Sequence, residues 1–159
     1  MSDRQRLAYL EDNLEILYEK LGEFEQELII SSSQPAKFEL KQRIKREILP
    51  NIRRYEAEYW EIYPKEAIII SDEEAASQLV KVEQAVESID RISLTFYHRE
   101  LIPLLQDIRA ELEEQNKAAS AKLKVVLPLI PMIASYELEI ETEGLMYKAW
   151  KSIKRLVRR

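Results

Sequence analysis

Cysteine is absent from this sequence, glycine occurs only twice and histidine only once. Without cysteine the chain can form no disulfide, thiolate metal site or thiol nucleophile. Gly22 and Gly144 stand too far apart to build a glycine-rich phosphate-binding loop. No apolar run approaches the ~18 residues that a membrane-spanning helix requires. The polar residues after Met1 lack the apolar core of a secretion signal, so we expect a cytoplasmic protein.

His98, the only histidine, has no serine or carboxylate arrangement around it that forms a catalytic motif. We therefore expect His98 to be a polar residue at a helix kink. A di-iron site in a helical bundle needs Glu-x-x-His on two helices, whereas Thr95 stands three residues before His98. The sequence predicts no catalytic residue, no metal site and no cofactor.

The charges are distributed unevenly along the chain. The net charge is −5, but residues 145–159 hold six cations and no acid, which leaves −11 for residues 1–144. The hydrophobic fraction of 46% and the charged fraction of 33% are typical of a helical protein with a solvated surface. We therefore expect the C-terminal segment to interact differently from the rest of the chain.

Residues 3–30 are predicted to form a long helix, because apolar side chains recur at alternating intervals of three and four residues. The apolar positions are Leu7, Leu10, Leu14, Leu17, Leu21, Phe24 and Leu28. The short connector Ser31–Pro35 implies that a second helix, residues 36–63, folds back antiparallel on the first. Pro50 predicts a kink or local break near Leu49.

Residues 72–120 are predicted to form a third helical segment. Ser71 and Glu74 match the capping-box pattern at its N-terminus. Pro103 lies inside its apolar pattern, so we expect one kinked helix or two nearly collinear helices that meet around residues 100–103. The sequence thus predicts a helical bundle over residues 1–121, of the coiled-coil type.

Alternating apolar and polar residues over 122–127 and 134–141 are typical of β-strands. They predict a small β-hairpin whose apolar, proline-containing turn lies between the strands. A basic amphipathic helix is expected to follow over residues 143–157, with Met146, Trp150, Ile153 and Val157 on its apolar face. Residues 122–159 would then form a second part of the protein.

The basic helix is the strongest functional feature of the sequence. Its apolar face could complete the bundle, or the helix could bind a protein partner, an anionic membrane surface or phosphate groups. Nucleic acid is the least favoured of these, because no basic, aromatic-rich surface occurs elsewhere on an acidic chain. The candidate contact residues are Lys148, Trp150, Lys151, Lys154, Arg155, Arg158 and Arg159.

The densest aromatic and acidic segment is Tyr55–Tyr63, which contains Glu56, Glu58 and Glu61. A pair of these carboxylates could act as acid and base only in a cleft that raises a pKa. The simpler interpretation is a helix with tyrosines on its buried edge and glutamates in water.

Residues 34–44, Gln-Pro-Ala-Lys-Phe-Glu-Leu-Lys-Gln-Arg-Ile, follow one heptad helix and begin another. In this setting, residues 5–63 resemble the small helical adaptor modules of cyanobacterial signalling proteins. Those modules accompany NTPase, caspase-like and TIR conflict systems. The resemblance implies an adaptor that recruits, or is recruited, through protein contacts. The catalytic motifs of those systems are missing here, so no functional residue is carried over.

These observations favour a non-enzymatic interaction module that acts through its helical faces and its cationic C-terminal helix. Its expected partner is another protein or a second copy of the chain. The alternative hypothesis is a peripheral membrane-binding or membrane-perturbing protein that uses residues 143–159.

Overall fold

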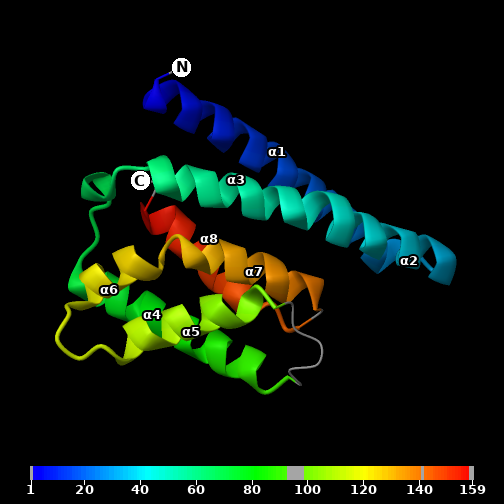
Figure 1. The fold of residues 1–159 in the computed structure, drawn as a ribbon. Helices are drawn as coiled ribbons and strands as arrows, with labels where there is room; N and C mark the ends of the chain where they lie inside the picture. The colour runs from blue at the N-terminus through cyan, green and yellow to red at the C-terminus, as the bar shows by residue number, and fades with distance from the viewer. Residues whose placement is uncertain (1, 93–98, 141, 158–159) are drawn as a thin grey trace. The chain divides into compact units, whose positions relative to one another are not determined.

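The structure is a computed structural model that describes residues 2–92, 99–140 and 142–157. Every regular element in these ranges is helical, and no strand occurs in them. The mainly helical fold that the sequence predicts is therefore confirmed. The chain divides into two compact units, Met1–Tyr63 and Pro64–Arg159 (Figure 1). The division that the sequence predicts between residues 121 and 122 falls inside one helix, Ala119–Val126.

The first arm of unit 1 is the helix α1, Asp3–Ile30. The Ser2 side chain accepts a hydrogen bond from the Gln5 amide, and the Gln5 side chain accepts one from the Ser2 amide. This capping box satisfies two amides that the first helical turn leaves without partners. The bounds agree with the predicted range because both capping and heptad spacing are local properties of the sequence.

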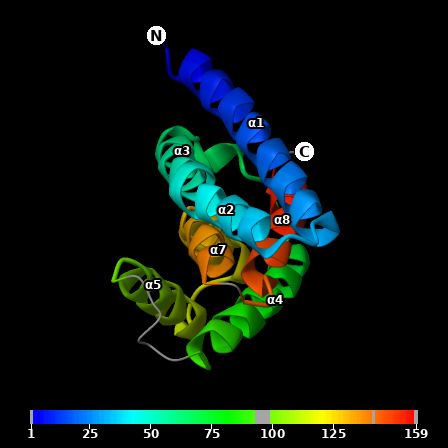
Figure 2. The same cartoon turned by 90° about the vertical axis from the view of Figure 1, so that its right-hand side faces the viewer.

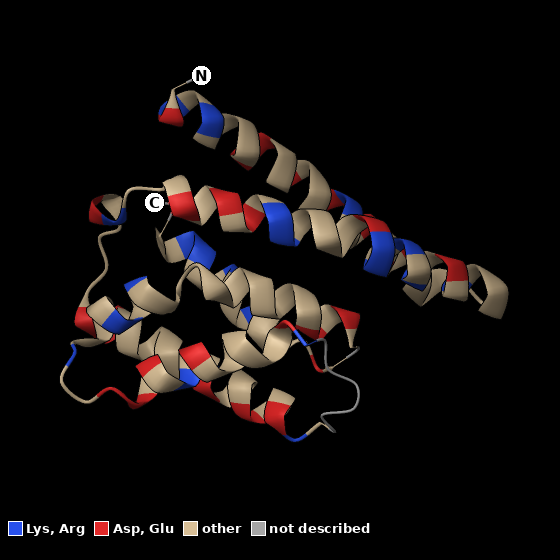
Figure 3. Ribbon diagram, viewed as in Figure 1, with Lys and Arg blue, Asp and Glu red and all other residues tan. Residues whose placement is uncertain are grey.

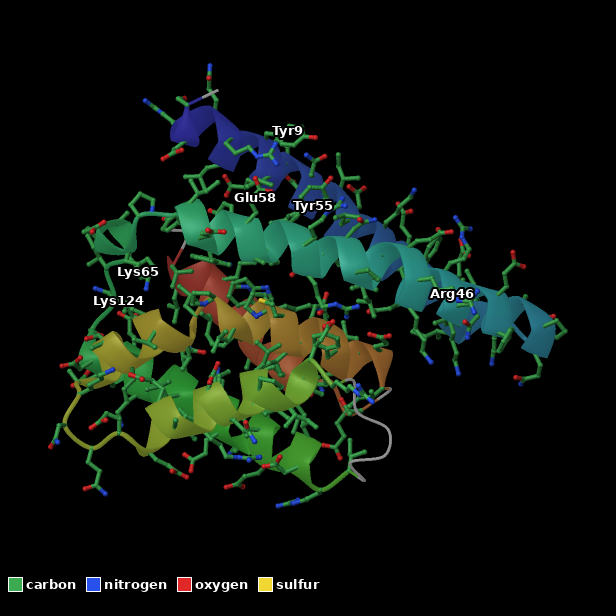
Figure 4. All side chains as sticks on the ribbon, in the orientation of Figure 1. Tyr9, Arg46, Tyr55, Glu58, Lys65 and Lys124 are labelled. Atoms are coloured by element: carbon green, nitrogen blue, oxygen red, sulfur yellow. The ribbon has the colours of Figure 1, made fainter. Side chains whose placement is uncertain are left out.

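The second arm consists of α2, Gln34–Arg43, and α3, Leu49–Ile62, and α3 packs antiparallel against α1 (Figure 1). Four residues of the predicted apolar seam are buried: Leu10, Leu14, Leu21 and Phe24. Near the start of α1, Arg6 donates hydrogen bonds to both carboxylate oxygens of Glu58, at 2.6 and 3.0 Å. Figure 4 labels Glu58 on α3, on the side of that helix that faces α1. Burial of the seam and this bidentate ion pair hold the two arms together.

One π-helical turn, Ile44–Ile48, separates α2 from α3. The Leu49 amide bonds to the Ile44 carbonyl five residues earlier, instead of the usual four. Pro50 follows at once; it has no amide hydrogen, and its ring would crowd the carbonyl of the preceding turn in a regular α-helix. The break that the sequence predicts near Leu49 therefore takes the form of a widened turn.

The π turn also keeps apolar side chains aligned along the second arm. Leu40, Ile44, Ile48 and Ile52 follow one another at intervals of four residues, and the last three are buried. In an α-helix each step of four residues overshoots a full turn by ~40°, so the row would drift around the helix. A turn that contains more residues offsets part of this drift.

Unit 2 begins with a short 3₁₀ turn, Lys65–Ala67, followed by the longer helices. These are α4 (Asp72–Asp90), α5 (Leu101–Glu113), α6 (Ala119–Val126), α7 (Leu129–Glu139) and α8 (Leu145–Val157). The helix α4 packs against α5, α6 and α8, while α7 lies between α5 and α8 (Figures 1 and 2). The core of this unit is therefore shared by helices that are distant in sequence.

The predicted segment 72–120 is not one kinked rod. It contains α4, α5 and the start of α6, and α5 packs side by side with α4 instead of extending it. Arg109 on α5 forms an ion pair with Asp90, the last residue of α4. His98, which was expected at a kink, lies outside the described residues. Pro103 is in the first turn of α5, where an amide has no helical acceptor in any case.

The predicted β-hairpin is wrong, because residues 122–127 and 134–140 belong to α6, α7 and their ends; residue 141 lies outside the described residues. The side chains of Leu123, Val126, Leu127, Ile130, Ile133 and Ala134 are buried, at intervals of one, three or four residues. This spacing fits a helix as well as the local alternation fits a strand. Pro131 is tolerated in the first turn of α7, where no helical bond is lost.

The two glycines offer a matched stability test. Gly144, which precedes α8, has φ +73°, a conformation that costs an L-residue about 1 kcal/mol or more. Gly22 lies inside α1, and an added Cβ would meet no atom within 4 Å. Urea unfolding should show Gly144→Ala destabilised by about 1 kcal/mol and Gly22→Ala stabilised by about 0.5–1 kcal/mol. Stabilisation by Gly144→Ala would contradict the left-handed backbone at this position.

Candidate functional site

The basic helix predicted over residues 143–157 is α8, and its first turn is held by a carboxylate from α7. Glu137 Oε2 accepts the Met146 amide and Oε1 accepts the Tyr147 amide, each at 3.0 Å. These amides belong to the first turn of α8, where no carbonyl of the same helix is available to accept their hydrogen bonds. Burial raises the pKa of the Glu137 carboxyl, although the bonds from the two amides oppose that rise.

The apolar face of α8 is buried. Its buried residues are Met146, Ala149, Trp150, Ile153 and Val157, and the helix packs against α4 and α7. Trp150 is one of the contact residues that the sequence predicts, but its side chain is only 1% exposed. Trp150 is thus a core residue in this structure, because burial of a large aromatic side chain is more favourable than its exposure to water.

Lysine and arginine are the only charged residues of α8, and Figure 3 shows blue positions near its C-terminal end. Lys148, Lys151 and Arg155, here called the cationic strip, are exposed. They follow at intervals of three and four residues and so share one side of the helix. Lys154 is half-buried at its flank. Arg158 and Arg159, the remaining predicted contact residues, lie outside the described residues.

A lysine from another helix lies beside this face. Lys81 on α4 donates a hydrogen bond from Nζ to Ser152 Oγ on α8, at 3.2 Å. Lys81 is not among the residues that the sequence predicts for this site, because it stands seventy-one residues before Ser152 and only the packing of α4 on α8 brings them together. The Nζ of Lys151 lies 4.4 Å from the centre of the Tyr147 ring, a cation–π contact that leaves the charge in place.

In the part of the chain that the structure describes, the cationic strip lacks carboxylate partners. Among the described residues, no aspartate or glutamate lies within ion-pair distance of Lys81, Lys148, Lys151 or Arg155. The charges of these side chains are therefore exposed to solvent, and three of them share one helix face. Such a face attracts negative charge at short range.

The aromatic and acidic segment of α3 differs from its expected form. Glu56 is fully buried, whereas it was expected to lie in water. Tyr18 Oη donates to Glu56 Oε1 at 2.7 Å, and Trp60 Nε1 donates to Oε2 at 2.9 Å. The carboxylate thus joins α1 to α3 through hydrogen bonds. Of the other two glutamates, Glu61 is exposed and Glu58 is bound by Arg6.

Each unit has a groove among its described residues. The first, of about 710 Å³, is lined by Gln84, Glu87, Ser88, Arg91, Ile92, Thr142, Glu143 and Leu145. The second, of about 450 Å³, is lined by Glu27, Ile30, Ser31, Ala36, Glu39, Leu40 and Arg43. Each groove combines two glutamates with one arginine. Within the described residues, no group of three or more histidine, aspartate or glutamate side chains could hold a metal ion.

Two further results bear on function. No single helix in the described ranges has both the length and the apolar composition of a membrane span, but α6 and α7 together pass this test as a pair bent by 57°. Comparison of the chain with protein-family models, curated proteins and solved structures gave no match. The site is therefore interpreted from its own geometry.

Proposed function

We propose that this protein is a non-enzymatic interaction module that binds an acidic protein surface through the cationic strip of α8. The observation that carries the proposal is the division of α8 into two faces. Its apolar face is buried in unit 2, while Lys148, Lys151 and Arg155 face outward without carboxylate partners in the described part of the chain. Charged faces of this kind add specificity and speed to protein association.

The packing of α8 favours a protein partner over membrane insertion. An amphipathic helix that enters a membrane must present its apolar face to the lipid. In α8 that face would first have to leave the core, at the cost of exposing Trp150, Ile153 and Met146. Surface charge, in contrast, is available without any change of fold.

A direct test uses a fluorescent helical peptide whose glutamates recur at intervals of three and four residues. Fluorescence anisotropy at low salt should show binding to the native chain, and the triple variant K148E/K151E/R155E should bind about tenfold more weakly or worse. The matched control is K20E/K37E/R46E, which changes the net charge equally but lies in unit 1. Equal weakening by both variants would contradict the proposal, since it would show that only net charge matters.

Binding to an anionic membrane surface is the second candidate, because exposed lysine and arginine side chains such as those of the cationic strip attract anionic lipid headgroups. Co-sedimentation with vesicles of phosphatidylcholine alone and of phosphatidylcholine with phosphatidylserine separates the two functions. Under the first proposal the chain stays in the supernatant with both vesicles. Pelleting with the anionic vesicles that the α8 triple variant abolishes would favour the membrane candidate.

A further inference from the structure

A second charged strip runs along the outer face of α1. Asp12, Glu15, Glu19 and Glu23 are all exposed and follow at intervals of three, four and four residues, so they share one side of the helix. We call these four residues the acidic strip. Among the described residues, no lysine or arginine lies within ion-pair distance of any of them.

The acidic strip matches the cationic strip in spacing. Lys148, Lys151 and Arg155 repeat the three-residue and four-residue intervals with which the acidic strip begins. Both helices rise 1.5 Å per residue, so equal sequence intervals place the charges at equal distances along the two axes. In a parallel alignment each of the three cations can therefore face one carboxylate. In an antiparallel alignment the order of the two intervals is reversed, so the middle pair is offset by one residue along the axis. This offset is shorter than the reach of a lysine or arginine side chain.

Exposed apolar side chains adjoin the acidic strip. Ile16, which follows Asp12 by four residues and precedes Glu19 by three, is 59% exposed. Tyr9, seven residues before Ile16, is 46% exposed. Both side chains lie along one edge of the acidic strip, and the Arg6 guanidinium lies 5.0 Å from the centre of the Tyr9 ring. Apolar side chains next to charged ones are the usual composition of a protein interface.

We infer that the partner of the cationic strip is a second copy of this chain, bound through the acidic strip on α1. This inference rests on the proposed function and names its partner. Each chain carries both strips, so two copies can make the contact twice in a closed dimer, or once each in an open chain of copies. The association depends on charge and therefore weakens as salt is added.

Charge reversal provides the test, with sedimentation velocity measured over a range of protein concentrations. The native chain should self-associate at ~20 mM NaCl and dissociate at ~500 mM NaCl. D12K/E15K/E19K and K148E/K151E/R155E should each be monomeric at low salt, because like charges then face each other. The control K20E/K37E/R46E should associate as the native chain does. Circular dichroism checks that each variant remains helical.

Two combinations make the result specific. A mixture of the two reversed variants should associate, because each then offers the charge that the other lacks. A chain that carries both reversals should self-associate again, and it retains the native net charge because the six changes cancel. A native chain that is monomeric at low salt would overturn the inference, and so would a doubly reversed chain that stays monomeric. If the acidic peptide still binds in that case, the proposed function stands without this partner.

Discussion

Replacing Trp150 with alanine is expected to lower the free energy of unfolding of unit 2 by about 3–5 kcal/mol. The side chain is 1% exposed and belongs to the α8 face that packs against α4 and α7. Alanine would leave a cavity and remove the contacts that hold α8 in place. Urea titration followed by circular dichroism measures the change, and Lys151→Ala, on the exposed face, should alter stability by less than about 0.5 kcal/mol.

This experiment also distinguishes the two interpretations of α8. If α8 bound membranes through Trp150 in its resting state, the side chain would be accessible and its removal would change stability little. A loss of several kcal/mol in the free energy of unfolding would show that the Trp150 side chain is part of the core. An unchanged unfolding curve would contradict the packing of α8 described above.

The second large effect is expected at Glu137. Glu137→Ala should destabilise the protein by about 2–4 kcal/mol, because the amides of Met146 and Tyr147 lose their buried acceptor. Glu137→Gln keeps one amide oxygen that can accept a bond and should cost less. Thermal or urea unfolding of both variants measures the difference. Equal stability of Glu137→Ala and the native chain would show that α8 does not depend on this anchor.

The Glu137 carboxyl also makes the free energy of unfolding depend on pH, and its stabilising contribution decreases as the pH rises. Burial raises the pKa of Glu137 above its ordinary value of 4.5, so the folded chain holds the proton more tightly than the unfolded chain. Its stabilising contribution is complete below that ordinary value and is lost as pH rises through the raised pKa. Subtracting the unfolding free energies of Glu137→Gln from those of the native chain isolates this trend. A difference that grows with pH would contradict it.

Subtracting the Glu137→Gln values is necessary because other carboxyls change the pH dependence of stability in the opposite direction. Hydrogen bonds from Ser120 lower the pKa of Asp72, and the hydrogen bonds from Arg6 lower the pKa of Glu58. Their stabilising contributions are present at neutral pH and are lost as the pH falls through their lowered pKa values. The native pH profile is therefore a combination of both signs.

Features that depend on neighbouring residues were accessible from the sequence. The range of α1 follows from its heptad spacing, and the irregularity before Pro50 follows from the missing amide hydrogen. The cationic side of α8 was likewise visible as a run of lysines and arginines. Each of these features needs only a few residues of context.

Features set by packing were not accessible. Seven of the eleven residues of α7 are buried, and such a helix shows no single apolar stripe. A short alternation within it then resembled a strand. The anchoring of α8 by Glu137, the approach of Lys81 to Ser152 and the burial of Glu56 all join different helices. Trp150 was assigned to a contact surface because the sequence left open whether the apolar face was covered.

The widened turn at Ile44–Ile48 makes unit 1 unequally tolerant of insertions and deletions. Losing one residue there would rotate every later side chain of α3 by about 100° around the helix axis. Glu56 would then turn away from Tyr18 while the helix kept nearly its full length. The connector Ser31–Ser33 can change length without rotating either arm. Length variation among related chains is therefore expected at this connector and not within the π turn.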